Sequence, residues 1–169
     1  AFDGAAMALT ALGNISERRI FQLILGQAPN LNIYLARKPG LESGFMILQY
    51  AAAALASENK TLAHPASAAS IPSSANKEDF VSMGMWAALK LKQIVSNTAQ
   101  IVAIELICAA QGVDVHSPLK PGRGVAEGLA RLRARVAAAK GDEVFGPRME
   151  LVRELVLAGY FTGLPGFGE

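Results

Sequence analysis

Three adjacent charged residues, Lys77, Glu78 and Asp79, form the stretch of this chain best suited to acid–base chemistry. Burial that raises the pKa of Glu78 would let its carboxyl group act as a general acid or base. Lys77 could then keep that carboxylate ionised, bind a carboxylate of a ligand, or point to solvent. The simpler interpretation is a helix start, with Asn76 as N-cap and both acids in the first turn, where the helix dipole favours them. Lys77 fits this interpretation poorly, because a cation opposes the dipole there.

The other reactive residue types give little indication of a second site. The single cysteine, Cys108, lies in an apolar helical pattern and is expected to be a small buried side chain. One cysteine permits no disulfide within the chain, which suits a reducing cytoplasm. His64 and His116 are far apart and lack the spacing of metal ligands, so no metal site is expected. A formal net charge of +2 and an aromatic content of 7% give no indication of nucleic-acid binding.

Hydrophobic periodicity predicts helices and no strands, so the expected fold class is all-α. Apolar residues recur at helical spacing, and stretches rich in Pro, Gly, Asn or Ser at 27–41 and 61–75 separate the first three helices. The predicted helices cover residues 4–26, 43–60, 76–111, 125–139 and 147–159.

The predicted helix over 76–111 is the longest element and determines the expected architecture. At 1.5 Å per residue it would be about 54 Å long, which exceeds the diameter of a compact domain of this size. We therefore expect a long-helix bundle completed by other chains or by further sequence, in agreement with the high hydrophobic content of 51%. A membrane is not expected, because no run of about 18 apolar residues is free of polar ones. The expected apolar stripe consists of Leu91, Ile94, Val95, Thr98, Ile101, Val102, Glu105 and Cys108.

Eight sequence blocks, in order along the chain, point to a known family. Together they resemble the C-terminal half of the aromatic amino acid ammonia-lyases that use 4-methylidene-imidazole-5-one (MIO), and most closely the histidine-specific enzymes, histidine ammonia-lyases. The blocks are GNISERRI (13–20), GFMILQ (44–49), ALASENK (54–60), HPAS (64–67), SIPSSAN (70–76), EDFVSMG (78–84), AIELICAAQG (103–112) and PLKPGRG (118–124).

The resemblance implies an enzyme that eliminates ammonia from an aromatic L-amino acid, with L-histidine to urocanate as the first expectation. It also implies a cytoplasmic homotetramer whose long helices form a superhelical core, with residues 1–169 as the C-terminal part of the domain. The family makes MIO from an Ala-Ser-Gly tripeptide, which this chain lacks. The near match Glu42-Ser43-Gly44 belongs to a different block. We therefore expect the N-terminal half to be missing and this chain to be inactive alone.

The resemblance also implies roles for three residues. Glu78 matches the family's active-site glutamate, which lies near the substrate amine and MIO and is thought to assist proton transfer. Phe2 matches an aromatic residue that lines the substrate pocket. Lys77 flanks the glutamate where histidine-specific members usually have Gln, and Phe80 stands where they usually have His, so Lys77 is a candidate substrate-binding residue.

These two departures leave the substrate open. A tyrosine or phenylalanine ammonia-lyase and a 2,3-aminomutase both remain alternatives to a histidine ammonia-lyase. A non-catalytic helical assembly domain, with the same bundle but without the electrophile, is a further alternative.

Overall fold

The computed structural model describes residues 1–166, and within them it contains helices and no strand, which confirms the all-α prediction. Two short 3-10 turns, η1 (Ile33–Leu35) and η2 (Ala66–Ala68), lie in the loops. The α-helices are α1 (Phe2–Ile24), α2 (Met46–Leu62), α3 (Gly84–Val115), α4 (Arg123–Arg133) and α5 (Gly146–Leu157).

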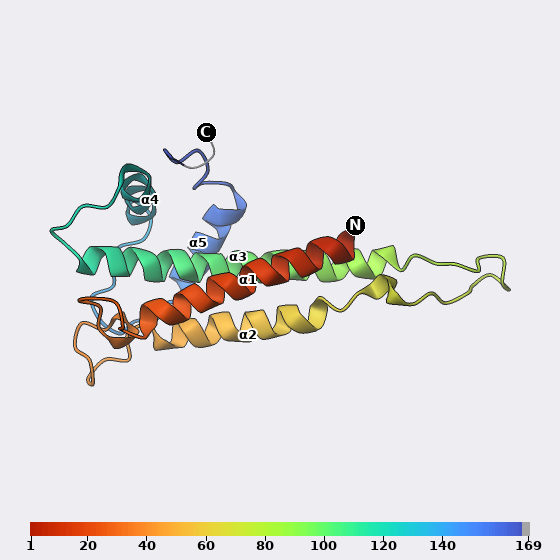
Figure 1. The fold of residues 1–169 in the computed structure, drawn as a ribbon, viewed down its shortest axis with the longest axis horizontal. Coiled ribbons are helices and arrows are strands. Elements are labelled where there is room, and N and C mark those ends of the chain that lie inside the picture. Colours follow the sequence, from red (N-terminus) through yellow and green to blue (C-terminus); the bar gives the residue numbers. More distant parts are fainter. Residues whose placement is uncertain (167–169) are drawn as a thin grey trace.

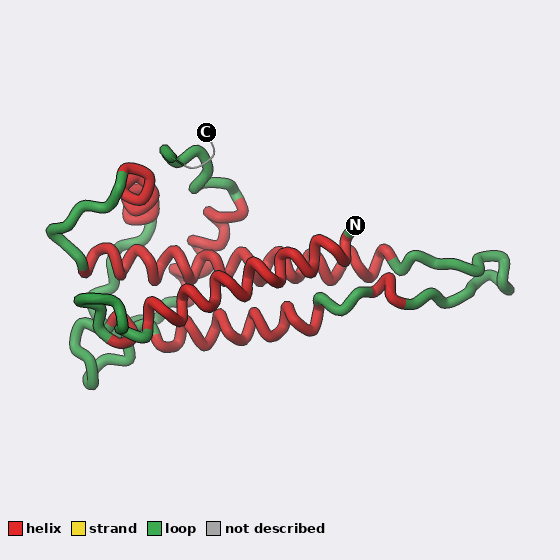
Figure 2. The backbone as a smooth tube through the Cα atoms, viewed as in Figure 1, coloured by secondary structure: helices red, strands yellow, loops and turns green. Residues whose placement is uncertain are grey.

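The helices α1, α2 and α3 lie side by side along the long axis of the molecule, with α1 and α3 running in one direction and α2 in the other (Figure 1). Their apolar residues recur at helical spacing and meet in one core, in which Ile20, Leu48, Ile101 and Ile104 are fully buried. The helix α4 lies near the C-terminal end of α3, and α5 packs against α3. The three long helices therefore form a rod from which the loops extend (Figure 2).

The long helix α3 starts eight residues later than predicted. Ser74, Ala75 and Asn76 have positive φ angles of 53°, 55° and 67°, a left-handed conformation that a right-handed helix cannot contain. Asn76 is therefore not an N-cap, and the prediction that Glu78 and Asp79 lie in the first turn of a helix was wrong. With 32 residues α3 is about 48 Å long, still long enough to require a bundle beside it.

The C-terminal boundaries also differ from the prediction. Gly112 lies inside α3 rather than at its end, since the cost of one helical glycine, about 1 kcal/mol, is small beside the packing of a buried helix. The helix α4 ends at Arg133, earlier than predicted. The backbone of Ala139, which the prediction placed in this helix, is hydrogen-bonded instead to the Gln111 side chain of α3. Gln111 Nε2 donates to the Ala139 carbonyl (3.3 Å), and the Ala139 N–H donates to Gln111 Oε1 (3.1 Å).

Among the described residues, α3 is the one helix long and apolar enough to span a membrane. Just over half of its most apolar stretch is buried against the other helices, as is usual for the central helix of a bundle. Length and composition alone do not distinguish a membrane-spanning helix from the central helix of a bundle. In this structure the other helices bury part of the apolar surface of α3.

Candidate functional site

The segment between α2 and α3, residues 63–83, extends beyond the ends of the helices as a narrow hairpin, here named the 63–83 hairpin (Figures 1 and 2). Near its tip the Ser73 N–H donates to the Glu78 carbonyl (2.9 Å) and the Glu78 N–H donates to the Ser73 carbonyl (3.3 Å). Closer to the helices, the Val81 N–H donates to Ser70 Oγ (2.7 Å). The left-handed residues 74–76 reverse the chain between the two arms.

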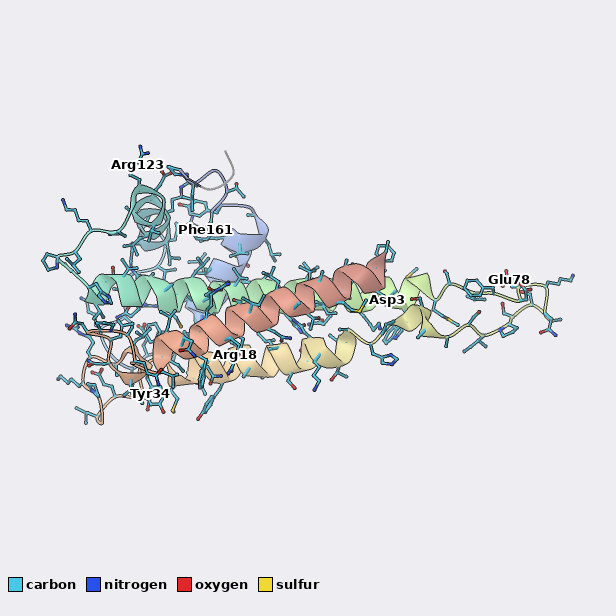
Figure 3. All side chains as sticks on the ribbon, in the orientation of Figure 1. Asp3, Arg18, Tyr34, Glu78, Arg123 and Phe161 are labelled. Carbon is cyan, nitrogen blue, oxygen red and sulfur yellow. The ribbon has the colours of Figure 1, made fainter. Side chains whose placement is uncertain are left out.

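Glu78 lies near the tip of this hairpin, far from the helical rod (Figure 3). Its Oε2 accepts a hydrogen bond of 2.5 Å from the Ser73 hydroxyl, which orients the carboxylate. All residues from 71 to 80 are exposed in this chain. A carboxylate in solvent lacks the burial that tunes acid–base catalysts, so another chain or another part of the protein would have to supply it.

Lys77 and Asp79 flank Glu78 and are both exposed. The Lys77 N–H donates to the Ser74 carbonyl (3.2 Å) and so closes the turn. In the part of the chain that the structure describes, the Lys77 side chain makes no ion pair. Pairing with Glu78, one of the three possibilities raised by the sequence, is therefore not observed in a single chain.

Phe2 is the first residue of α1, and its side chain is 49% exposed. Its neighbour Asp3 marks the start of α1 in Figure 3, and Glu78 lies well beyond it toward the hairpin tip. The structure does not bring Phe2 and Glu78 together within one chain.

The sequence prediction missed Asp3, a residue that is 7% exposed and whose carboxylate is turned toward the hairpin. It accepts hydrogen bonds from the Ser67 hydroxyl (2.7 Å), the Ser67 N–H (2.9 Å) and the Ala66 N–H (3.2 Å). These bonds favour the charged form and lower the pKa of Asp3 to about 2. A signal was present in the sequence, because Asp3 has helical spacing with Ala6, Thr10 and Gly13 on the buried face of α1.

A family model described as "Aromatic amino acid lyase" matches residues 1–134 of this chain. The chain belongs to the aromatic amino acid lyase family. The family resemblance inferred from the eight sequence blocks is thereby confirmed.

Three similar proteins show where the chain stands in this family. It is 49% identical over 156 residues to a histidine ammonia-lyase of Symbiobacterium thermophilum, a match that covers 92% of this chain and 31% of that protein. The crystal structure of histidine ammonia-lyase from Trypanosoma cruzi superposes with a TM-score of 0.90 at 41% identity, over 95% of this chain and 32% of the other. A tyrosine aminomutase from Streptomyces globisporus gives the same TM-score at 34% identity, over 95% and 31%. The chain thus spans about a third of the length of the relatives it matches.

The Ala-Ser-Gly tripeptide from which the family makes MIO does not occur in residues 1–169. The near match Glu42-Ser43-Gly44 begins with Glu rather than Ala, and its amides are engaged: the Ser43 N–H (3.0 Å) and the Gly44 N–H (2.8 Å) both donate to the Asp142 carboxylate. Glu42 itself accepts from the Arg37 N–H (3.0 Å) and the Lys38 N–H (3.1 Å). These hydrogen bonds hold the loop around residues 37–44 in place, and the tripeptide does not fit the role of a cofactor precursor.

Cys108 and His116, two further residues of reactive type, are engaged within the fold. Cys108 is fully buried, and burial raises the pKa of its thiol, which fits the predicted small buried side chain. The His116 ring contacts the Gly112 carbonyl through Nδ1 (2.8 Å) and the Pro29 carbonyl through Nε2 (3.0 Å). Within residues 1–166 there is no group of three or more His, Cys, Asp or Glu side chains that could hold a metal ion.

A shallow hollow of about 430 Å³ lies where the returning arm of the hairpin enters α3. Met85 (76% exposed), Trp86 (60%) and Leu89 (51%) give it an apolar surface. Exposed side chains of this size are expected where another protein surface packs. The hollow is lined by Val81, Ser82, Met83, Gly84, Met85, Trp86 and Leu89.

Proposed function

We propose that this chain is the C-terminal part of an ammonia-lyase that converts L-histidine to urocanate. The observation that carries the proposal is its 49% identity to a histidine ammonia-lyase over 92% of the chain. The superposition on the Trypanosoma cruzi enzyme, at a TM-score of 0.90, supports the same assignment. In such a reaction the bond from the α-carbon to the amine nitrogen breaks, the β-carbon loses a proton, and an α,β-unsaturated acid and ammonia result.

In this proposal Glu78 assists proton transfer at the substrate amine. Its place near the tip of the 63–83 hairpin, outside the fold of its own chain, suits a residue delivered to a pocket built by another part of the assembly (Figure 3). The Ser73 hydroxyl orients its carboxylate before it enters that pocket. Phe2 lines the substrate pocket and Lys77 contacts the substrate, and the separation of Phe2 from Glu78 suits a site that takes each from a different copy.

We further propose that the active form is a cytoplasmic homotetramer and that this chain alone is inactive. Several large apolar side chains on α1 are at least 45% exposed: Phe2, Met7, Leu12 and Ile15. Such a face supports burial against other subunits or against the rest of the protein. The MIO electrophile would come from an Ala-Ser-Gly outside this chain.

An aminomutase acting on tyrosine is the second candidate. Lys77 and Phe80 depart from the histidine-specific pattern on both sides of Glu78 and Asp79, and Phe80 is 77% exposed. The equal TM-score of 0.90 with a tyrosine aminomutase supports this alternative, while the lower identity of 34% favours the lyase.

The test is to express the full-length product of the reading frame that encodes this chain and to supply L-histidine, L-phenylalanine and L-tyrosine separately. Absorbance would follow urocanate, cinnamate and coumarate, and chromatography would detect β-amino acids. We expect urocanate to form fastest. A β-amino acid as main product would instead establish the mutase, and no product from any of the three would favour a non-catalytic assembly domain.

A further inference from the structure

Two buried charges, Asp3 of α1 and Lys90 of α3, meet at the base of the 63–83 hairpin. Each residue is 7% exposed, and Lys90 Nζ lies 3.9 Å from Asp3 Oδ1. Burying charged groups is costly unless they are paired and hydrogen-bonded. A distance of 3.9 Å is too long for a direct hydrogen bond, so the bonds that satisfy these charges lie elsewhere.

Those bonds are made to one short stretch of the hairpin, residues 64–67. Asp3 accepts from the Ala66 N–H, the Ser67 N–H and the Ser67 hydroxyl. Lys90 donates to the His64 carbonyl. The helices α1 and α3 pack along each other, so residues 64–67 are held by one side chain from each of two packed helices.

Within residues 1–166, the part of the hairpin beyond residues 64–67 has no comparable support from the helices. Residues 71–80 are all exposed, and the arms are joined by the Ser70–Val81 bond and the paired bonds of Ser73 and Glu78. A small change of direction at residues 64–67 therefore displaces Glu78 by a larger amount at the tip (Figure 3).

We propose that Asp3 and Lys90 are positioning residues that set the direction of the 63–83 hairpin and thereby the place of Glu78. The inference rests on the catalytic role proposed for Glu78. Neither residue is expected to touch the substrate, and both act through the backbone of residues 64–67. Displacements of about 1 Å at a reacting group can lower a rate about a hundredfold, so the effect should appear in turnover.

A matched control is available on the same helix. Glu17 is 6% exposed, pairs with Arg18 at 2.6 Å and accepts from Gln49 Nε2 at 2.8 Å, so it joins α1 to α2. It makes none of the bonds to the hairpin. Glu17→Gln should therefore lower stability without redirecting Glu78.

The experiment compares Asp3→Asn, Lys90→Met, Ser67→Ala and Glu17→Gln in the full-length enzyme. We expect Asp3→Asn and Lys90→Met to lower kcat about ten- to hundredfold, with KM changed less than about threefold. Amide hydrogen exchange across residues 64–83 should become faster in both. Ser67→Ala removes one of the three bonds to Asp3 and should give an intermediate loss, and it carries the test if the charge variants fail to fold. Glu17→Gln should lower the thermal midpoint with kcat within about twofold of wild type.

Two results would overturn the proposal: Asp3→Asn that loses stability but retains wild-type kcat, or hydrogen exchange in the hairpin that matches wild type. Failure of the proposed function looks different. If Glu78→Gln leaves turnover intact, or no lyase activity exists, exchange at residues 64–83 still decides whether Asp3 and Lys90 hold the hairpin.

Discussion

The carboxylates of Asp3 and Glu78 have opposite surroundings. Asp3 is buried and accepts three hydrogen bonds, whereas Glu78 is exposed and accepts one from the Ser73 hydroxyl. The three hydrogen bonds keep the Asp3 carboxylate charged, and this carboxylate stabilises the fold. A carboxylate held near the tip of an extended hairpin is free to meet a ligand that another part of the protein presents.

The bonds to Asp3 predict a specific dependence of stability on pH. The Ser67 hydroxyl first, then the Ser67 and Ala66 N–H groups and Lys90, lower the pKa of Asp3 from 3.8 to about 2. A lowered pKa means that its contribution to stability is complete above about pH 4 and is lost as the pH falls toward about 2. The thermal midpoints of wild type and Asp3→Asn should therefore differ at pH 6 and converge between about pH 4 and pH 2. Circular dichroism melts at these pH values measure this, and a constant difference down to pH 2 would refute the assignment.

At the scale of elements, helical periodicity was sufficient to find five helices and the all-α class. It failed at residues 76–83, where Asn76 and two acids have the composition of a capped helix start but form a hairpin. The left-handed conformation of residues 74–76 does not affect hydrophobic periodicity. The hydrogen bonds that Asp3 accepts at the hairpin base connect residues more than sixty positions apart. The candidate Glu78 came from family motifs, while its exposure and its distance from α1 required the structure.

Gly44 offers a test of the loop that leads into α2. Its φ is +52°, and an added Cβ would lie 2.5 Å from the Tyr34 carbonyl oxygen, closer than real Cβ contacts. Gly40 also has a positive φ, +85°, but no atom within 4 Å of the same position. Gly40→Ala should cost about 1 kcal/mol for the backbone alone, and Gly44→Ala about 2–4 kcal/mol because the backbone must also move. Denaturant unfolding would compare them, and equal costs would contradict the close contact.

At the scale of the whole molecule, the apolar face of α1 is the most informative feature. Half of this chain is hydrophobic, and a rod of three helices is too thin to bury all of it. The relatives that the chain matches are about three times as long as this chain.

We therefore predict that the 169-residue chain self-associates in solution. Replacing Leu12 (45% exposed) and Ile15 (55% exposed) by Gln should reduce that association, because it removes apolar area from one face. Val144 is more exposed, at 83%, but lies in the loop before α5, so Val144→Gln is the control and should change little. Light scattering reports the mass, and a wild-type chain that is monomeric at all concentrations would count against the prediction.

The turnover of Glu78→Gln in the full-length protein tests the proposal that the 63–83 hairpin carries a catalytic carboxylate. Asp79→Asn is its control, because Asp79 is the adjacent exposed acid. Glu78→Gln should lower kcat by about 10²–10⁴-fold with the assembly unchanged in light scattering, while Asp79→Asn retains most activity. Wild-type turnover in Glu78→Gln would contradict a catalytic role for this residue.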